Sequence, residues 1–207
     1  MSRFGSPFSR RRFLAISAAA GITAAGPAIA APVQRWSGRA LGAEASMVFS
    51  GLDPEQATRL FGDVEREIQR LERIFSLYDP TSELRRLNAL GTLEAPSPEF
   101  VEVLSLCGGL VRATSGAFDP TVQPLWQHYA EAKSNTKPPD AAAVADARKL
   151  IGWDKVSVDL QRISFAKPGM GLTLNGIAQG YVTDRVAALL RRNGLRDVLV
   201  DIGEIMA

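Results

Sequence analysis

The segment from Asp53 to Phe75 constrains the fold of this chain most strongly. Its apolar side chains recur every three or four residues, as on one face of a helix; they are Leu60, Phe61, Val64, Ile68, Leu71 and Phe75. The preceding Asp53-Pro54-Glu55-Gln56 supplies an N-cap, a proline at the first helical position and a glutamine placed for a capping box. The pattern predicts a long amphipathic helix, with the charged run 65–73 as its solvent-exposed face.

A half-buried strand is expected before this helix, over residues 40–49, because apolar and polar side chains alternate there. After the helix, Asp79-Pro80 favours a loop over residues 76–91, in which Ser82 and Glu83 can cap a short helix. A second amphipathic helix is expected to begin at Ser97-Pro98 and to stop by Gly116.

The remaining segments alternate between helix and strand without a repeat. Residues 137–140 predict a turn before a short alanine-rich helix that ends near Gly152, and residues 156–165 predict a hairpin. An extended segment, a helix and an apolar strand are expected at 172–174, 177–192 and 198–200. This order predicts an α+β fold, a mixed sheet with flanking helices. Since the sequence stops directly after a buried-looking strand, we expect a fragment of a longer domain.

Composition excludes several classes of protein. With 46% hydrophobic and 22% charged residues, the chain is globular rather than disordered. Its one cysteine, Cys107, and its one histidine, His128, rule out a Cys/His zinc site, an intrachain disulfide and a two-histidine metal centre. Cys107 lies on the apolar face of the second predicted helix and is expected to be buried and unreactive. His128 has no partner nearby in the sequence and is expected to be structural.

The net charge of +2 originates in the first 30 residues, which hold Arg3, Arg10, Arg11 and Arg12 and no acidic residue. The rest of the chain has 20 basic and 22 acidic residues, a balance of −2. A nucleic-acid partner therefore has no electrostatic support.

Residues 1–30 are organised as an export signal. The arginines precede an uncharged stretch rich in alanine and glycine, which ends at Ala28-Ile29-Ala30 and predicts a mature start at Ala31. Paired arginines followed by Phe13-Leu14 resemble the twin-arginine signal, which cells often use for proteins that acquire a cofactor before export. An uncleaved membrane anchor is the alternative, although so many small residues make a poor membrane helix.

Three further segments contain candidate functional residues. In residues 173–184, Gly176 and Gly180 lie at a predicted helix start, where a phosphate or a ring can approach the backbone. The alternative is that these glycines end a strand and permit close helix packing.

In the second segment, residues 114–121, Asp119 is expected to be an exposed hydrogen-bond acceptor beside the flat ring of Phe118. Such a pair suits a nucleotide base or an isoalloxazine ring. The alternative is that this sequence is an ordinary turn. The third segment, residues 75–88, contains Tyr78, which can equally be a core residue.

Taken together and in this order, the segments resemble the FAD:protein FMN transferases, the ApbE-like flavin transferase family. The patterns that carry the resemblance are Trp36-Ser37-Gly38, Ala40-Leu41-Gly42-Ala43, Phe-Ser-x-Tyr, Ser-Glu-Leu and Leu-Asn within 75–88, Thr-x-Gly-Ala-Phe-Asp at 114–119, Gly-Ile-Ala-x-Gly-Tyr-x-x-Asp at 176–184, and Asp-Ile-Gly-Glu at 201–204. The resemblance implies a T-fold-type domain over residues 31–207, incomplete at its C-terminus, behind a signal peptide at 1–30.

The resemblance implies transfer of FMN from FAD, with Mg²⁺, to a threonine or serine hydroxyl of a target flavoprotein. The acceptor would belong to a membrane-bound redox complex that faces the periplasm. Phosphoryl transfer needs a divalent cation and well-placed attacking and leaving oxygens, which fits such a site. The alternative is an FAD-binding accessory protein for a respiratory complex, such as that of nitrous oxide respiration.

The resemblance also implies the site residues, without assigning a catalytic one. Leu41 and Tyr78 would contact the flavin or its chain, and Ala117, Phe118 and Asp119 would hold the adenosine part. Gly176 would give a backbone carbonyl to Mg²⁺. Thr173 and Gln179 would line the FAD groove. The family often has an acidic residue in place of Thr173 and a lysine or glutamate in place of Gln179, and such changes can weaken transfer while FAD binding is retained. Its acidic metal ligands lie in a C-terminal segment beyond this sequence.

Overall fold

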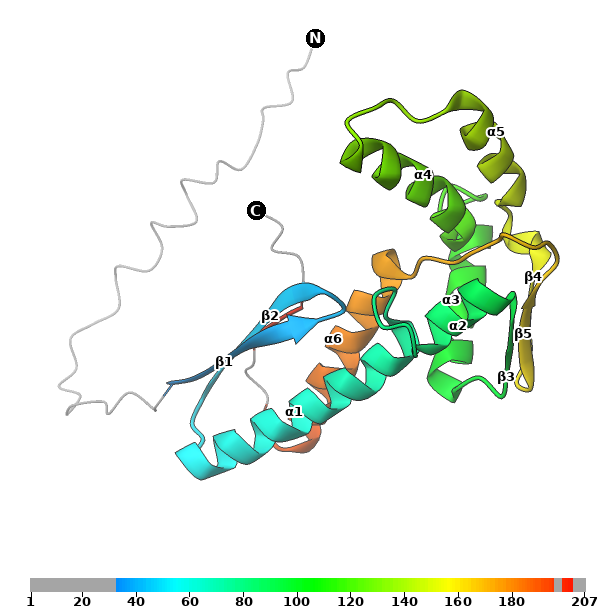
Figure 1. Ribbon diagram of the computed structural model, residues 1–207. Helices are drawn as coiled ribbons and strands as arrows, with labels where there is room; N and C mark the ends of the chain where they lie inside the picture. The colour runs from blue at the N-terminus through cyan, green and yellow to red at the C-terminus, as the bar shows by residue number, and fades with distance from the viewer. Residues whose placement is uncertain (1–32, 196–198, 203–207) are drawn as a thin grey trace, which may run out of the picture. The chain divides into compact units, whose positions relative to one another are not determined.

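The computed structural model describes residues 33–195 and 199–202 (Figure 1). The predicted export signal therefore lies outside the described residues, as does Val198 of the last predicted strand. The elements follow in the order β1 (Val33–Ala40), β2 (Ala43–Ser50), α1 (Pro54–Phe75), α2 (Glu83–Leu90), β3 (Thr92–Glu94), α3 (Pro98–Ala113), η2 (Pro120–Val122), α4 (Gln123–Ser134), α5 (Ala141–Leu150), η3 (Trp153–Lys155), β4 (Val156–Val158), β5 (Arg162–Phe165), α6 (Asn175–Arg192) and β6 (Leu199–Ile202). Over these described ranges, no helix is both long and apolar enough to cross a bilayer.

The described strands form two antiparallel sheets. In one sheet, β2 lies between β1 and β6, and in the other, β5 lies between β3 and β4. The predicted α+β class and the predicted hairpin β4–β5 are confirmed. The strands are divided between two small sheets, and every described pair is antiparallel, whereas one mixed sheet is predicted from the sequence.

A tight turn interrupts the strand predicted over residues 40–49. Leu41 and Gly42 have φ angles of 51° and 85°, and Ala40 pairs with Ala43 across them. Positive φ at both central residues is the requirement of a type I′ hairpin turn, which glycine meets easily and leucine does not. The alternating pattern therefore spans the turn as well as β2, and β1 itself is not predicted.

The Trp-x-Gly pattern has a structural role in β1. A Cβ atom on Gly38 would lie 2.5 Å from Cη2 and Cζ2 of Trp36, so the indole ring covers the glycine. The indole Nε1 donates a hydrogen bond of 2.8 Å to Glu65 Oε1 on α1. This close approach lets Trp36 join β1 to the long helix.

Helix α1 confirms the predicted helix and contributes a large part of the core. Asp53 accepts a hydrogen bond of 2.9 Å from the Gln56 N–H, which caps the helix as the sequence predicts. The predicted apolar face is buried apart from Phe61, which is partly buried and packs against the core. Figure 1 shows α1 beside α6, and α1 also contacts β1, α2 and α3.

The loop expected after α1 contains the short helix that Ser82 and Glu83 are predicted to cap, because residues 83–90 form α2. The Ser82 hydroxyl accepts a hydrogen bond of 3.1 Å from the Arg85 N–H and caps this helix. Glu83 Oε2 accepts bonds of 2.9 and 3.1 Å from the N–H and the hydroxyl of Ser97, at the start of α3. The Ser-Glu-Leu pattern thus fixes the N-termini of two helices.

Later boundaries differ modestly from the prediction. Helix α3 ends at Ala113, and the Gly116 N–H bonds back to the Val111 carbonyl at 2.9 Å. Helix α4 is not predicted, and α6 begins at Asn175 rather than Ile177. Cys107 is fully buried, as predicted, and burial raises the pKa of its thiol to about 12. His128 lies half-buried on α4.

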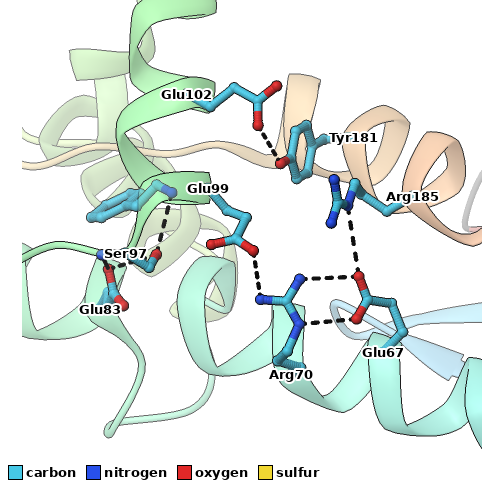
Figure 2. Close-up of polar contacts among 9 residues, drawn as sticks. Glu67, Arg70, Glu83, Ser97, Glu99, Glu102, Tyr181 and Arg185 are labelled. Carbon is cyan, nitrogen blue, oxygen red and sulfur yellow. Dashed lines mark hydrogen bonds and ion pairs between the residues drawn. The ribbon is translucent and has the colours of Figure 1, made fainter.

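The charged face of α1 is only partly exposed to solvent, which corrects the prediction. Arg70 pairs with Glu67 at 2.9 Å and with Glu99 of α3 at 2.7 Å, and Glu67 also lies 3.7 Å from Arg185 of α6 (Figure 2). The hydrogen bonds from Arg70 hold the pKa of Glu67 below its ordinary value. These ion pairs connect three helices that also share the apolar core.

Candidate functional site

Hydrogen bonds bring the three candidate segments to one place. The Asn88 amide Nδ2 donates to the Leu172 carbonyl at 2.9 Å, and the Leu172 N–H donates to Asn88 Oδ1 at 2.8 Å. The next residue, Thr173, donates its backbone N–H to the Pro120 carbonyl at 2.8 Å. We call the set Asn88, Pro120, Leu172 and Thr173 the motif junction. It joins α2, the turn before α4 and the segment before α6.

The Phe118 ring lies close to the start of α6. A Cβ atom on Gly176 would stand 3.9 Å from Phe118 Cε2, an ordinary van der Waals distance. The Phe118 N–H donates to the Thr114 hydroxyl at 3.1 Å, which holds the turn that carries the ring. The resemblance assigns Phe118 to the adenosine part of FAD and Gly176 to Mg²⁺, and these two residues are therefore neighbours. Ala117 is exposed on the same turn as Phe118.

Asp119 is half-buried, although the sequence predicts an exposed acceptor. Its Oδ1 atom accepts hydrogen bonds from the N–H and the hydroxyl of Thr121, at 2.8 and 2.6 Å. The Thr121 hydroxyl in turn accepts a bond of 2.7 Å from the Gly152 N–H. Asp119 thus caps η2 with Oδ1. Its bond to adenosine stays a prediction, and Oδ2 is the atom that would accept it.

The two glycines of α6 are not required by packing within the described residues. A Cβ atom on Gly180 would meet nothing within 4 Å, and both glycines are exposed. No side chain caps the N-terminus of α6, so its first N–H groups are free of side-chain competition. This arrangement counts against the close-packing alternative and leaves room for a ligand beside the helix start.

Thr173 and Gln179 are half-buried on either side of this helix start. Gln179 lies one turn into α6, and its backbone carbonyl accepts a bond of 2.9 Å from the Thr183 hydroxyl. Their assignment to an FAD groove stays a prediction.

Tyr78 lies in a cavity of about 570 Å³, beside the turn that contains Leu41. The cavity is lined by Arg39, Gly42, Glu72, Ser76, Tyr78 and Asp79. The Tyr78 side chain is 67% exposed, so it is not the core residue that the sequence also allows. An exposed aromatic face suits stacking against a planar ring.

Packing between aromatic rings joins the end of α1 to α6. The Phe75 ring, three residues before Tyr78, meets the Tyr181 ring of α6 edge-on at a centroid distance of 5.5 Å. The Tyr181 hydroxyl donates a 2.6 Å hydrogen bond to Glu102 Oε2 of α3, as Figure 2 shows. Burial, followed by the bond to Glu102, raises the pKa of Tyr181, so its hydroxyl stays protonated at neutral pH.

The described side chains contain no cluster of metal-ligating groups. Among the side chains that the structure describes, no three from His, Cys, Asp or Glu lie close enough together to hold a metal. Mg²⁺ prefers an octahedron of oxygen ligands, and the Gly176 carbonyl predicted for it belongs to the first turn of α6. The predicted metal contact therefore stays a prediction.

Sequence comparison agrees with the family resemblance of these segments. Residues 41–207 match the ApbE family. The FAD:protein FMN transferase of Haemophilus influenzae is 30% identical over 151 residues, which are 68% of this chain and 43% of that protein. An FAD:protein FMN transferase of Klebsiella pneumoniae is 29% identical over 190 residues, 87% of this chain and 53% of that protein.

Solved structures give the same result. A mutant form of the flavin transferase ApbE from Vibrio cholerae superimposes with a TM-score of 0.74 at 26% identity, over 84% of this chain and 61% of that one. The apo flavinyl transferase ApbE of Pseudomonas stutzeri superimposes with a TM-score of 0.71 at 27% identity, over 84% and 60%.

The fold and the joined segments therefore define a flavin-transferase-type α+β domain. The chain belongs to the ApbE family. It spans about half the length of the curated relatives it matches.

Several residues of the site are not found by sequence reasoning. Arg39, Glu72 and Ser76 line the Tyr78 cavity, and none of them is a predicted site residue. Asn88 is noted in the Leu-Asn pattern without a role. Its place in a short helix is the signal that could have found it. An asparagine side chain usually disfavours a helix because it competes for backbone hydrogen bonds, so asparagine there indicates a bond to another segment.

Proposed function

We propose that the chain belongs to an FAD:protein FMN transferase, which moves FMN from FAD to a threonine or serine hydroxyl of a target flavoprotein. The observation that carries the proposal is the motif junction. Hydrogen bonds join segments 84 residues apart around an uncapped helix start, beside an aromatic ring and two glycines that packing does not require.

The chemistry determines what such a site must do. The acceptor oxygen attacks the phosphorus on the FMN side of the FAD pyrophosphate, the bond to the bridging oxygen breaks, AMP leaves, and the hydroxyl proton passes to a base. The protein mainly positions these groups and stabilises negative charge on the phosphate oxygens. In the proposal, Phe118 and Asp119 hold the adenosine part, the N-terminus of α6 lies near the phosphates, and Leu41 and Tyr78 contact the flavin.

Dependence on Mg²⁺ is part of the proposal. A pyrophosphate carries concentrated negative charge, and phosphoryl-transfer enzymes neutralise it with a divalent cation. In the proposal, the backbone carbonyl of Gly176 is one ligand of such an ion.

The place of action is proposed from the N-terminal sequence. The arginine-rich, small-residue leader at 1–30 supports twin-arginine export to the periplasm. An exported transferase would meet an acceptor flavoprotein there, and a membrane-bound redox complex with a periplasmic face is the partner we propose.

The test is FMN transfer itself. The intact protein is incubated with FAD, Mg²⁺ and a candidate acceptor domain, and the mass of the acceptor is measured. We expect an FMN adduct that needs the acceptor hydroxyl and does not form when a chelator is present from the start. An acceptor whose threonine is replaced by valine is the control, and it must stay unmodified.

The second candidate is an FAD-binding accessory protein for a respiratory complex. It is favoured by Thr173 and Gln179, which are uncharged where the resemblance leads us to expect charged side chains. Such a protein would retain intact FAD with or without chelator and would modify none of a panel of acceptors, and that outcome would replace the transferase proposal.

A further inference from the structure

The turn between β1 and β2 has an unusual backbone. Leu41 has a φ angle of 51°, in the left-handed region that bulky side chains disfavour, and it occupies the position of a type I′ turn where asparagine or glycine is usual. A strained residue persists only where its surroundings hold it, and such residues concentrate at functional sites.

Two side chains hold this turn. Glu72, on α1, accepts a hydrogen bond of 2.8 Å from the Leu41 N–H to its Oε1 atom, across 31 residues of sequence. Arg39, on β1, donates from Nη2 to the Gly42 carbonyl at 2.9 Å. The turn thus has a polar contact at each of its two central residues, and Glu72 supplies the one that fixes it to α1.

The Leu41–Gly42 turn also supports the ring of Tyr78. A Cβ atom on Gly42 would lie 2.7 Å from Tyr78 Cε2, so the ring rests against the glycine. On the other side, the Ser76 hydroxyl accepts 3.0 Å hydrogen bonds from the N–H groups of Tyr78 and Asp79. The ring is otherwise exposed, so the Gly42 turn and the Ser76 cap set its position.

We propose that Glu72 is a positioning residue for the flavin: by holding the Leu41–Gly42 turn against α1, it places the Tyr78 ring in the cavity. The inference rests on the proposed function, because it takes a flavin to be the occupant of that cavity. Because Glu72 acts by holding the turn, we expect its effect on FAD binding rather than on the chemical step.

The experiment compares Glu72→Ala with Glu72→Gln in the intact protein. Glutamine keeps an oxygen acceptor for the Leu41 N–H, whereas alanine removes it. Glu55→Ala, at the exposed start of the same helix, is the matched control. The readouts are hydrogen exchange of the Leu41 amide without FAD, the Kd for FAD, and KM and kcat for transfer.

We expect Glu72→Ala to lose protection at Leu41 and to raise both the Kd and the KM for FAD by about tenfold, with kcat changed less than about twofold, since a loss of uniform binding appears in KM. Glu72→Gln and Glu55→Ala should stay close to the unmutated protein.

An unchanged Kd in Glu72→Ala, with FAD bound normally by the unmutated protein, would overturn the positioning role and leave the transferase proposal intact. If the unmutated protein shows Leu41 protection but binds no FAD, the proposed function fails, and the flavin role of Glu72 fails with it.

Discussion

The side chain of Asn88 forms two hydrogen bonds with the backbone of Leu172, 84 residues further along the chain. One amide side chain therefore satisfies both backbone groups of a buried residue just before α6. Because Thr173 then bonds to Pro120, this contact fixes the register among all three candidate segments. The site depends on long-range hydrogen bonds rather than on any single motif.

Replacing Asn88 by alanine should destabilise the fold and weaken FAD binding. It leaves the N–H and the carbonyl of Leu172 without partners, which costs roughly 1–3 kcal/mol for a buried group. Urea unfolding with FAD titration measures both effects. Asn193→Ala removes an exposed amide that donates to the Leu189 carbonyl of α6, and it should change stability by no more than about 0.5 kcal/mol. Equal losses in both variants would contradict the role of the junction.

Replacing Gly180 by alanine should raise the stability of the fold and weaken FAD binding. The added methyl group meets no protein atom within 4 Å, and alanine favours a helix over glycine by about 0.5–1 kcal/mol. We expect a higher melting temperature together with weaker FAD binding, because the methyl group enters the proposed groove. Gly109→Ala on α3 is also unobstructed and should give the stability gain alone. Unchanged FAD affinity in the Gly180 variant would place the groove elsewhere.

Replacing Thr121 by valine should release the turn that carries Asp119. Its buried hydroxyl donates to Asp119 and accepts from Gly152, so valine removes both bonds while keeping the shape. The expected cost is about 1–3 kcal/mol in the free energy of unfolding, measured by denaturant titration. Thr121→Ser keeps the hydroxyl and should recover most of the loss; a serine variant as unstable as the valine variant would show that the methyl group, not the hydroxyl, matters.

The ion pairs of Glu67 predict a loss of stability in acid. Bonding to Arg70 lowers the pKa of Glu67 in the folded protein from its ordinary value of 4.5. A carboxylate with a lowered folded pKa stabilises the fold above its unfolded pKa, and this contribution is lost as the pH falls through the folded pKa. The free energy of unfolding should therefore fall below pH 4.5. Glu67→Gln should fall less steeply over that range, and parallel curves for the two proteins would refute the assignment.

Local signals in the sequence predict several elements correctly. Helix α1 is predicted because its cap, its proline and its apolar face agree, and Asp53 and Pro54 lie where expected. The β4–β5 hairpin and the burial of Cys107 are also confirmed. Each was predictable because its signal comes from residues nearby in the chain.

The missed features depend on tertiary contacts. The charged face of α1 bonds to α3 and α6 through Arg70 and Glu67, which no periodicity can distinguish from a face exposed to water. The left-handed Leu41 is also unpredictable locally, because leucine is not a turn residue and its N–H is held by Glu72 on another element. The site follows from the order of its motifs, whereas their joining through Asn88 needs the folded structure.

The most direct test of the central claim is the Kd for FAD of the intact protein, measured by flavin fluorescence for the unmutated chain, Tyr78→Ala and Gln179→Ala. These residues belong to segments about a hundred positions apart, and Tyr78 is largely exposed, so its removal should leave the fold intact. We predict that the unmutated protein binds FAD and that each variant binds it at least about tenfold more weakly, a loss of about 1.4 kcal/mol. No binding by the unmutated protein, or equal binding by all three, would contradict the account.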